Sequence, residues 1–250
     1  MEAKIRLYVD QPLGAGQAVA LSQDQAHYLT GVMRLGEGAA ILLFNGRDGE
    51  WRATLAQAGK RNAIAVCDAQ TRPLHLPPDL WLLFAPIKKA RTDFIVEKAV
   101  ELGAARILPV QTRHTNSERI RQDRLQAHAV EAAEQCGATF VPEVADLQPL
   151  DRLLRTWPED RALIWCDEAS ASAPPSPPRG GGMGWGGSGL PTAPAAILIG
   201  PEGGFSADEA ATLRSRPNVT PLSLGPRILR ADTAAVAALT LWQAACGDWR

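Results

Sequence analysis

The 250-residue chain has little cysteine, and its four cysteines form no CxxC pair. A zinc site and a disulfide framework are therefore both disfavoured, and the four dispersed histidines support no metal either. No apolar run approaches the roughly 18 to 20 residues that span a bilayer. The opening residues 1–6 lack the apolar core of a secretion signal. These absences favour a cytoplasmic protein with free thiols, no metal and no membrane partner.

The chain also lacks an excess of basic residues. Its formal net charge of −1 argues against a general coat for nucleic acid. A protein that binds one defined RNA site needs only a local basic face, however. Three groups of basic side chains suit such a face: Lys88, Lys89 and Arg91; Arg113, His114, Arg119, Arg121 and Arg124; and Arg227 with Arg230. The alternative is that each group is an ordinary solvated surface.

The first seventy residues show the pattern of short strands separated by turns. Five segments are rich in apolar and aromatic residues, namely 5–9, 17–21, 39–44, 51–56 and 63–68. The sequence Asn-Gly-Arg-Asp-Gly at 45–49 predicts a hairpin, because Asn and Gly tolerate positive φ. A short helix is expected at 26–34. We predict a small β-barrel over residues 1–72, and the proline-rich stretch 72–78 marks a domain boundary.

From Leu80 onward, predicted strands and helices alternate. The strands are expected at 80–85, 106–110, 162–166 and 196–200, and the helices at 92–102, 123–136 and 235–245. Such alternation predicts an α/β domain with a mostly parallel sheet over residues 78–250. Residues 172–194 interrupt the pattern, because 13 of these 23 residues are Gly or Pro. A segment of this composition cannot bury a core, so we expect a flexible insertion.

A glycine-rich turn follows the predicted strand at 196–200. Residues 200–206 read Gly-Pro-Glu-Gly-Gly-Phe-Ser, and Ser206 with Glu209 predicts a capping box that opens a helix. In open α/β sheets, ligands bind beyond the carboxyl ends of the strands, where glycine lets backbone amides approach. The turn is not a P-loop, because no lysine follows its glycine pair. It is a candidate ligand site, and a tight turn without a ligand is the alternative.

A second segment, residues 222–234, repeats this arrangement. A short strand leads to a Gly225-Pro226 turn, and polar residues then lead into an apolar helix. Asp232 or Thr233 is a candidate cap for that helix, and in the plainest interpretation Asp232 has no other role. Because the two Gly-Pro turns end two successive strands, we expect them to lie side by side in the sheet and to share a pocket.

These two motifs, with FIVEKAVELGAARILPV at 94–110 and AEQC at 133–136, closely resemble the RsmE family. Its members are 16S ribosomal RNA uridine-N3 methyltransferases of the SPOUT superfamily. The resemblance covers about residues 5–245, without the insertion. It implies a PUA-like β-barrel followed by an α/β domain with a trefoil knot that grips S-adenosylmethionine. It also implies a homodimer that methylates the family's position U1498 in the 16S rRNA of the small ribosomal subunit.

The resemblance further implies roles for individual residues. Cofactor contacts carry over to Leu198, Ile199, Gly200, Gly203, Gly204, Leu224, Gly225, Ile228 and Leu229. Arg230 matches an arginine near the methyl-transfer site. Asp232 is the first candidate for the base that takes the uridine N3 proton, and Glu202 is the second. From the basic clusters, we expect RNA contacts by Lys88, Arg91, Arg113 and Arg227.

Three features depart from the family's pattern. Ala231-Asp232 replaces the more usual Thr-Glu, Ala138 stands where an arginine is common, and the insertion at 172–194 is unusual. None of them removes the predicted cofactor loops. Two alternatives stay open: a SPOUT enzyme that acts on another RNA position, such as a ribose hydroxyl, and a non-catalytic RNA-binding protein.

Overall fold

The computed structural model describes residues 3–116, 120–167 and 189–249. The chain divides into two compact units, which we name the barrel unit (residues 1–76 and 133–141) and the α/β unit (residues 77–132 and 142–250). Most of the expected insertion, with Trp185, lies outside the described residues, as does Arg119. No helix in the described part is long and apolar enough to cross a membrane.

The barrel unit is built on one five-stranded sheet in the order β1-β3-β4-β5-β2. Its strands are β1 (Arg6–Tyr8), β2 (Ala18–Ala20), β3 (Ala40–Phe44), β4 (Glu50–Ala58) and β5 (Ala63–Arg72). All five predicted strands are confirmed. β3 and β4 pair antiparallel around the predicted hairpin, in which Gly46 and Gly49 have φ of 74° and 76°. An L side chain rarely adopts this conformation, so the glycines allow the tight connection.

The helix of the barrel unit begins earlier than the sequence predicts. α1 (Gln23–His27) is followed by a π-helical turn, η1 (Tyr28–Val32), whereas we expected one helix at 26–34. Ser22 starts the helix, because its hydroxyl accepts a hydrogen bond from the Gln25 N–H while the Gln25 side chain accepts one from the Ser22 N–H. Because of this capping box, the helix begins three residues before its apolar pattern does.

The α/β unit has a parallel sheet in the order β12-β10-β11-β6-β7-β8, with β9 paired to β7. The alternation of strands and helices is confirmed. The elements are β6 (Leu80–Phe84), α2 (Lys89–Glu101), β7 (Arg106–Gln111), α3 (Gln122–Cys136), β8 (Glu143–Val144), β9 (Gln148–Pro149), α4 (Leu150–Arg155), β10 (Ala162–Cys166), β11 (Ala195–Ile199), α5 (Ala207–Arg214), β12 (Val219–Leu222) and α6 (Ala231–Cys246).

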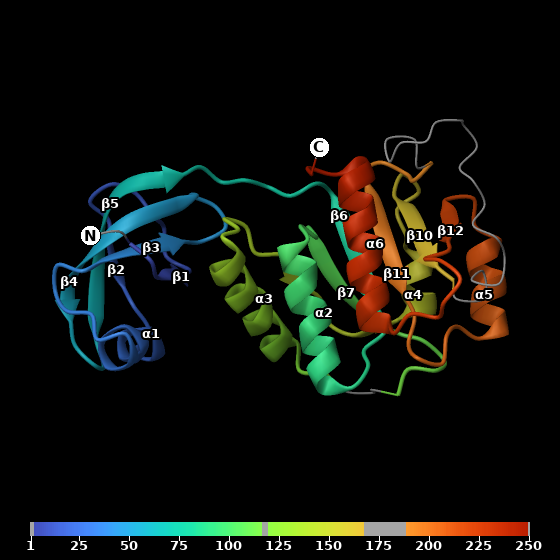
Figure 1. Cartoon of the computed structure of the whole chain (residues 1–250), viewed down its shortest axis with the longest axis horizontal. Coiled ribbons are helices and arrows are strands. Elements are labelled where there is room, and N and C mark those ends of the chain that lie inside the picture. Colours follow the sequence, from blue (N-terminus) through green and yellow to red (C-terminus); the bar gives the residue numbers. More distant parts are fainter. Residues whose placement is uncertain (1–2, 117–119, 168–188, 250) are drawn as a thin grey trace. The chain divides into compact units, whose positions relative to one another are not determined.

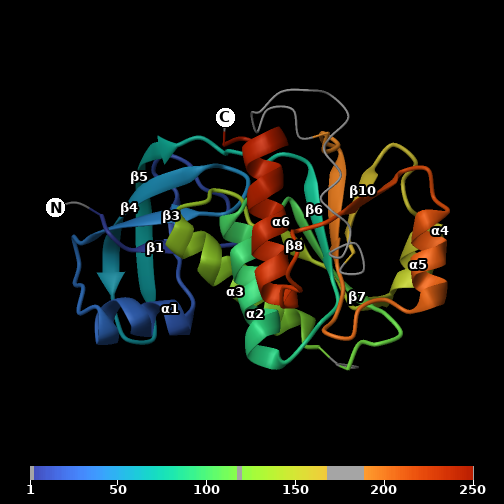
Figure 2. The ribbon, with the colours of Figure 1, turned by 45° about the vertical axis from the view of Figure 1, so that its right-hand side comes forward.

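Helices cover both faces of this sheet. α2 and α6 lie on one face, and α4 and α5 lie on the other (Figures 1 and 2). The paired residues Leu83, Leu198 and Trp165 share the core with α4 and α5. Because side chains alternate along a strand, Leu82, Ile197 and Ile164 point to the opposite face. All six are at most 1% exposed, which explains the continuous apolar runs of the sequence.

The strand order corrects one expectation about the two Gly-Pro turns. β11 and β12 are not neighbours, because β10 lies between them and pairs with both. Strand order depends on pairing between distant segments, which local patterns do not report. The three strands run parallel, so their carboxyl ends still meet at one edge of the sheet. The expected knot stays a prediction, since the connection from β10 to β11 includes residues outside the described part.

Candidate functional site

A cavity of about 180 Å³ opens at the carboxyl ends of β10, β11 and β12. The end of β10, the GPEGGF turn and the segment from β12 into α6 all contribute to its walls. The lining residues are Cys166, Asp167, Ile199, Gly200, Pro201, Glu202, Gly204, Phe205, Leu222, Leu224, Gly225, Arg227, Ile228, Leu229, Arg230, Ala231 and Ala234. The two motifs therefore share one pocket, although their strands are not adjacent.

The GPEGGF turn depends on glycine at two places. A Cβ on Gly200 would lie 2.7 Å from the Phe205 ring, so the ring packs directly on the backbone there. Gly204 has φ of 62°, and its N–H donates to the Pro201 carbonyl at 2.9 Å. The predicted capping box follows: Ser206 accepts from the Glu209 N–H, and the Glu209 carboxylate accepts from the Ser206 N–H at 2.8 Å. Local sequence thus determines the shape of this wall.

The loop after β7 supports the turn from outside the cavity. The Glu209 carboxylate also accepts a hydrogen bond from the Arg113 N–H at 2.8 Å. His114 Nδ1 lies 2.9 Å from the Gly203 carbonyl and donates to it, since a carbonyl only accepts. Gly203 consequently contacts His114 and does not line the cavity. The basic cluster in the sequence contained Arg113 and His114, but gave no sign of this contact.

α6 begins at Ala231, four residues before the predicted start, and its N-cap is Arg230 without a side-chain cap. The prediction that Asp232 or Thr233 caps the helix is therefore wrong. The helix starts early because Ala231, Ala234 and Ala235 extend its buried face. Asp232 lies in the first turn, where its negative charge favours the helix dipole.

Asp232 lies outside the cavity lining and forms an ion pair. Its Oδ2 is 3.6 Å from Nε of Arg91, which comes from α2. Both side chains are partly exposed. Arg91, expected to contact RNA, thus already has an acidic partner on α6. Glu202, the second candidate base, is exposed and lines the cavity.

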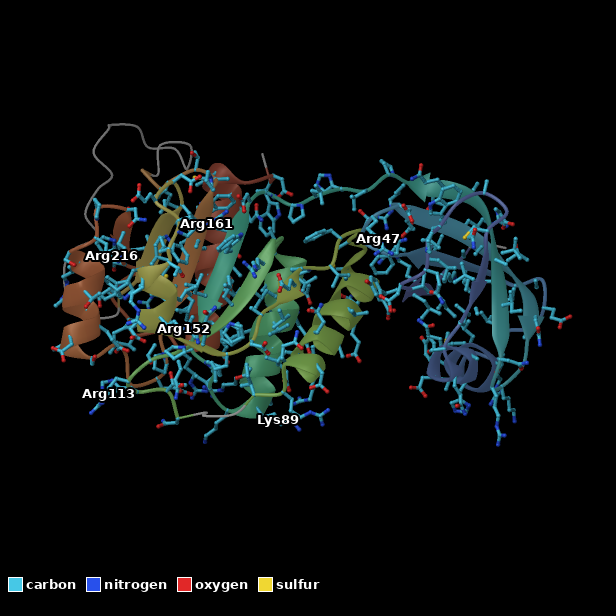
Figure 3. The ribbon with its side chains drawn as sticks, turned by 180° about the vertical axis from the view of Figure 1, so that it is seen from behind. Arg47, Lys89, Arg113, Arg152, Arg161 and Arg216 are labelled. Atoms are coloured by element: carbon cyan, nitrogen blue, oxygen red, sulfur yellow. The ribbon has the colours of Figure 1, made fainter. Side chains whose placement is uncertain are left out.

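The other predicted residues fall into four groups. Leu198 is fully buried in the core of the sheet and does not line the cavity. Arg227 and Arg230 are exposed on the cavity wall. The predicted cofactor residues in the lining are Ile199, Gly200, Gly204, Leu224, Gly225, Ile228 and Leu229. Lys88 and Arg113 are exposed and follow the carboxyl ends of β6 and β7. Figure 3 shows Arg113 and Lys89 at this end of the α/β unit, and Arg161 towards its opposite end.

Two lining residues at the end of β10 were missed by the sequence analysis. Burial raises the pKa of the Cys166 thiol to about 12, so it stays neutral at physiological pH. Asp167 is 8% exposed, and its Oδ2 lies 3.1 Å from Nη2 of Arg214. The Arg214 guanidinium lies 5.1 Å from the centre of the Trp165 ring. Their position at the end of a buried strand could have identified them as lining residues from the sequence.

The lining fits a nucleoside cofactor such as S-adenosylmethionine. Apolar side chains, including Leu224, Ile228 and Leu229, offer a surface for a purine. Gly204 and Gly225, with φ of 62° and 109°, keep the backbone open to close approach. The carboxylates offer acceptors for hydroxyl or ammonium groups. Across residues 3–116, 120–167 and 189–249, no group of three or more His, Cys, Asp or Glu side chains is placed to hold a metal ion.

Comparison with known proteins agrees with this geometry. Residues 75–243 match the family described as RNA methyltransferase domain, and residues 21–66 match the RNA methyltransferase PUA domain. Ribosomal RNA small subunit methyltransferase E of Synechocystis is 32% identical over 225 residues, covering 88% of this chain and 71% of the relative. The Rickettsia conorii protein of that name is 29% identical over 235 residues, covering 94% and 93%. This chain belongs to the ribosomal RNA small subunit methyltransferase E family.

Solved structures with bound cofactor share the fold. The Neisseria gonorrhoeae enzyme, ribosomal RNA small subunit methyltransferase E bound to S-adenosyl methionine, is 27% identical with a TM-score of 0.82, covering 98% of this chain and 99% of its own. A Legionella pneumophila protein in complex with the bound cofactor SAM is 29% identical with a TM-score of 0.83, covering 99% and 100%. The predicted fold class, an N-terminal PUA-like domain followed by a SPOUT α/β domain, is confirmed.

Proposed function

We propose that this chain transfers the methyl group of S-adenosylmethionine to N3 of a uridine in 16S rRNA, at the position that the family numbers U1498. The observation that carries this proposal is the shared cavity, where both family motifs and Arg230 meet. Its relatives are named for the RNA of the small ribosomal subunit, and two structural neighbours hold the cofactor. We propose the cytoplasm, where that subunit is assembled, as its compartment.

The cavity walls would hold and orient the cofactor. When bound, S-adenosylmethionine supplies a methyl group that its positive sulfur already activates. Leu224, Ile228 and Leu229 would pack on its adenine, and the backbone at Gly200 and Gly204 would approach its polar groups. The chain's main contribution is alignment, which accounts for several kcal/mol of barrier lowering in reactions between two held groups, up to roughly 7–11 kcal/mol.

The uridine must lose its N3 proton to become a nucleophile. Arg230, on the cavity wall, would stabilise the negative charge that develops on the uracil oxygens. A carboxylate that accepts the proton would contribute roughly 10² to 10⁴ in rate. Asp232 is the first candidate, because it lies directly after the lining residues Arg230 and Ala231. Glu202 is the second, because it lines the cavity from the facing turn.

Basic side chains near the carboxyl end of the sheet would hold the RNA. We propose phosphate contacts by Lys88, Arg91, Arg113 and Arg227, since such contacts position the substrate whatever its sequence. The target base would be unpaired or flipped out, because N3 lies on its Watson–Crick edge. We further propose that the barrel unit recognises the RNA, that the chain acts as a homodimer, and that the α/β unit is knotted.

The test is methyl transfer from radiolabelled cofactor to small subunits and to naked 16S rRNA that lack the modification. Nucleoside analysis should find 3-methyluridine. Label on a ribose or another base would show that the chain modifies a different position. RNA binding without any transfer would show that the protein is not an enzyme.

The base is tested by comparing Asp232→Asn with Glu202→Gln. The variant that removes the base should lose roughly 10² to 10⁴ in turnover with cofactor affinity unchanged, and higher pH should partly restore its rate. Asp208→Asn, an exposed acid in the first turn of α5, serves as the control. Near-normal turnover in Asp232→Asn would eliminate Asp232 and leave Glu202, or no protein base.

A further inference from the structure

Asp167 is a carboxylate that is both buried and part of the cavity wall. It directly follows β10, the strand between the two that carry the glycine turns. Its side chain is 8% exposed, whereas Glu202, the other carboxylate of the lining, is exposed. Burial of an ionised carboxylate costs free energy unless charge or hydrogen bonds compensate for it. The burial of Asp167 is therefore unusual for an acidic residue whose only role is to be solvated at the surface.

Arg214 holds this carboxylate from the last turn of α5. Nη2 of Arg214 donates to Oδ2 of Asp167 at 3.1 Å, and the guanidinium lies over the Trp165 ring. The aromatic contact and the hydrogen bond together restrict the arginine, so the arginine in turn fixes the carboxylate. A fixed acceptor at a cavity wall is suited to read the position of a hydrogen-bond donor on a ligand.

The chemistry of the wall indicates which donor this is. A carboxylate only accepts hydrogen bonds, so its ligand partner must carry O–H or N–H groups. Apolar side chains such as Leu224 and Ile228 suit the adenine, and the ribose is the next group along an adenosine. In dinucleotide sites of parallel α/β sheets, an acid beyond a strand's end accepts from the ribose hydroxyls. Asp167 stands at the corresponding place, at the end of β10.

We propose that Asp167 is a specificity-determining residue whose carboxylate accepts hydrogen bonds from the ribose hydroxyls of the cofactor, with Arg214 as its positioning residue. This inference rests on the proposed function, because it assumes that the cavity binds S-adenosylmethionine. It assigns to the end of β10 a part in cofactor selection that neither glycine turn provides.

Calorimetry on the full chain tests the assignment with two ligands. S-adenosylmethionine carries a ribose, a positively charged sulfur and an α-ammonium group, whereas 5′-methylthioadenosine keeps the ribose and lacks both positive charges. Asp167→Asn should weaken both ligands by the same factor, about tenfold or more, because it removes a charged acceptor. Asp208→Asn is the matched control and should bind both ligands like the wild type. Asn still accepts from Arg214, so the variant should keep its melting temperature.

The outcomes separate this inference from the proposed function. Unchanged affinity of Asp167→Asn for both ligands overturns the inference alone. A loss confined to S-adenosylmethionine also overturns it, because it assigns the carboxylate to the positively charged methionine part of that ligand. Failure of the wild type to bind either ligand overturns the proposed function as well. Should Asp167→Asn fail to fold, Arg214→Gln replaces it: an equal loss of affinity for both ligands supports the inference, and no loss overturns it.

Discussion

The barrel unit buries a carboxylate among its strands, whereas the central strands of the α/β unit are almost entirely apolar. Glu50, the first residue of β4, has a side chain that is only 4% exposed. It accepts hydrogen bonds from Nε of Arg6 at 2.6 Å, from Nε of Arg72 at 3.0 Å and from the Thr71 hydroxyl at 2.8 Å. In β11, by contrast, all five residues are buried and apolar.

The two units therefore depend on different interactions for their stability. Burial alone would raise the pKa of Glu50, but hydrogen bonds from Arg72, Arg6 and Thr71 lower it to about 2. Arg6 also donates to the carbonyls of Ala133, Glu134 and Ala138, so it joins residues 133–141 to the strands of the barrel unit. Charge and pH should therefore influence the strands of the barrel unit most, and packing should dominate in the central strands of the α/β unit.

The largest expected effect comes from Glu50→Gln. Arg6 is nearly buried, and the change leaves it without its counter-charge. This loss should cost about 3 kcal/mol of unfolding free energy. Hydrogen exchange resolved by segment should place the loss in the barrel unit. Glu143→Gln removes an exposed partner of Arg106 in the α/β unit and should change stability by less than about 1 kcal/mol. Equal effects of the two variants would contradict the comparison.

The second prediction concerns acid. The pKa of Glu50 is about 2 in the folded unit, against 4.5 ordinarily, so its contribution to stability is complete above about pH 4.5 and disappears as the pH falls towards 2. The protection factors of the amides in β4 and β5 should therefore fall over that interval before those of the amides in β11 do. Glu50→Gln should flatten this dependence. A profile with the same slope in the variant would show that other carboxylates control acid unfolding.

The third prediction uses matched glycines. Gly204 has φ of 62° and lines the cavity, and Gly16 has φ of 77° in the barrel unit with open space around it. Replacement by valine should cost each unit roughly 1–2 kcal/mol from the left-handed backbone. Calorimetry should show that Gly204→Val abolishes cofactor binding and that Gly16→Val does not affect it. Normal binding by a folded Gly204→Val protein would move the cofactor site elsewhere.

The smallest expected effects come from the two capping boxes. Ser22→Ala in the barrel unit and Ser206→Ala in the α/β unit should each lose about 1 kcal/mol, measured by urea unfolding. Only Ser206→Ala should also weaken cofactor binding, because Ser206 directly follows the GPEGGF turn. An equal change of affinity in Ser22→Ala would show that the two units are energetically coupled.

The sequence predicted the α/β unit best where burial produces a simple pattern of apolar residues. β6 and β11 lie within one residue of their predicted bounds, because strands buried on both faces appear as unbroken apolar runs. The six-residue helix α4 and the two-residue strands β8 and β9 were not predicted, since such short segments show no clear period. The capping box of Ser22 and Gln25 is visible in the sequence, but the prediction followed the apolar pattern and therefore placed the helix start at Ala26.

Features that depend on distant partners were beyond the sequence. The position of β10 between β11 and β12, the ion pair of Asp167 with Arg214 and the contact of His114 with Gly203 each join separate parts of the chain. The two motifs nevertheless predicted a shared pocket, because glycine turns at the ends of parallel strands come together at one edge. Side-chain partners, by contrast, follow from the three-dimensional arrangement alone.

The discontinuity of the barrel unit has a consequence for synthesis. Arg6 bonds to carbonyls 127 and 128 residues later in the chain. At a translation rate of about 5–20 residues per second, roughly 6 to 26 s separate the two partners as they leave the ribosome. During that interval β6, α2 and β7 of the other unit are also made. Strict folding from the N-terminus therefore cannot complete the barrel unit before most of α3 has been translated.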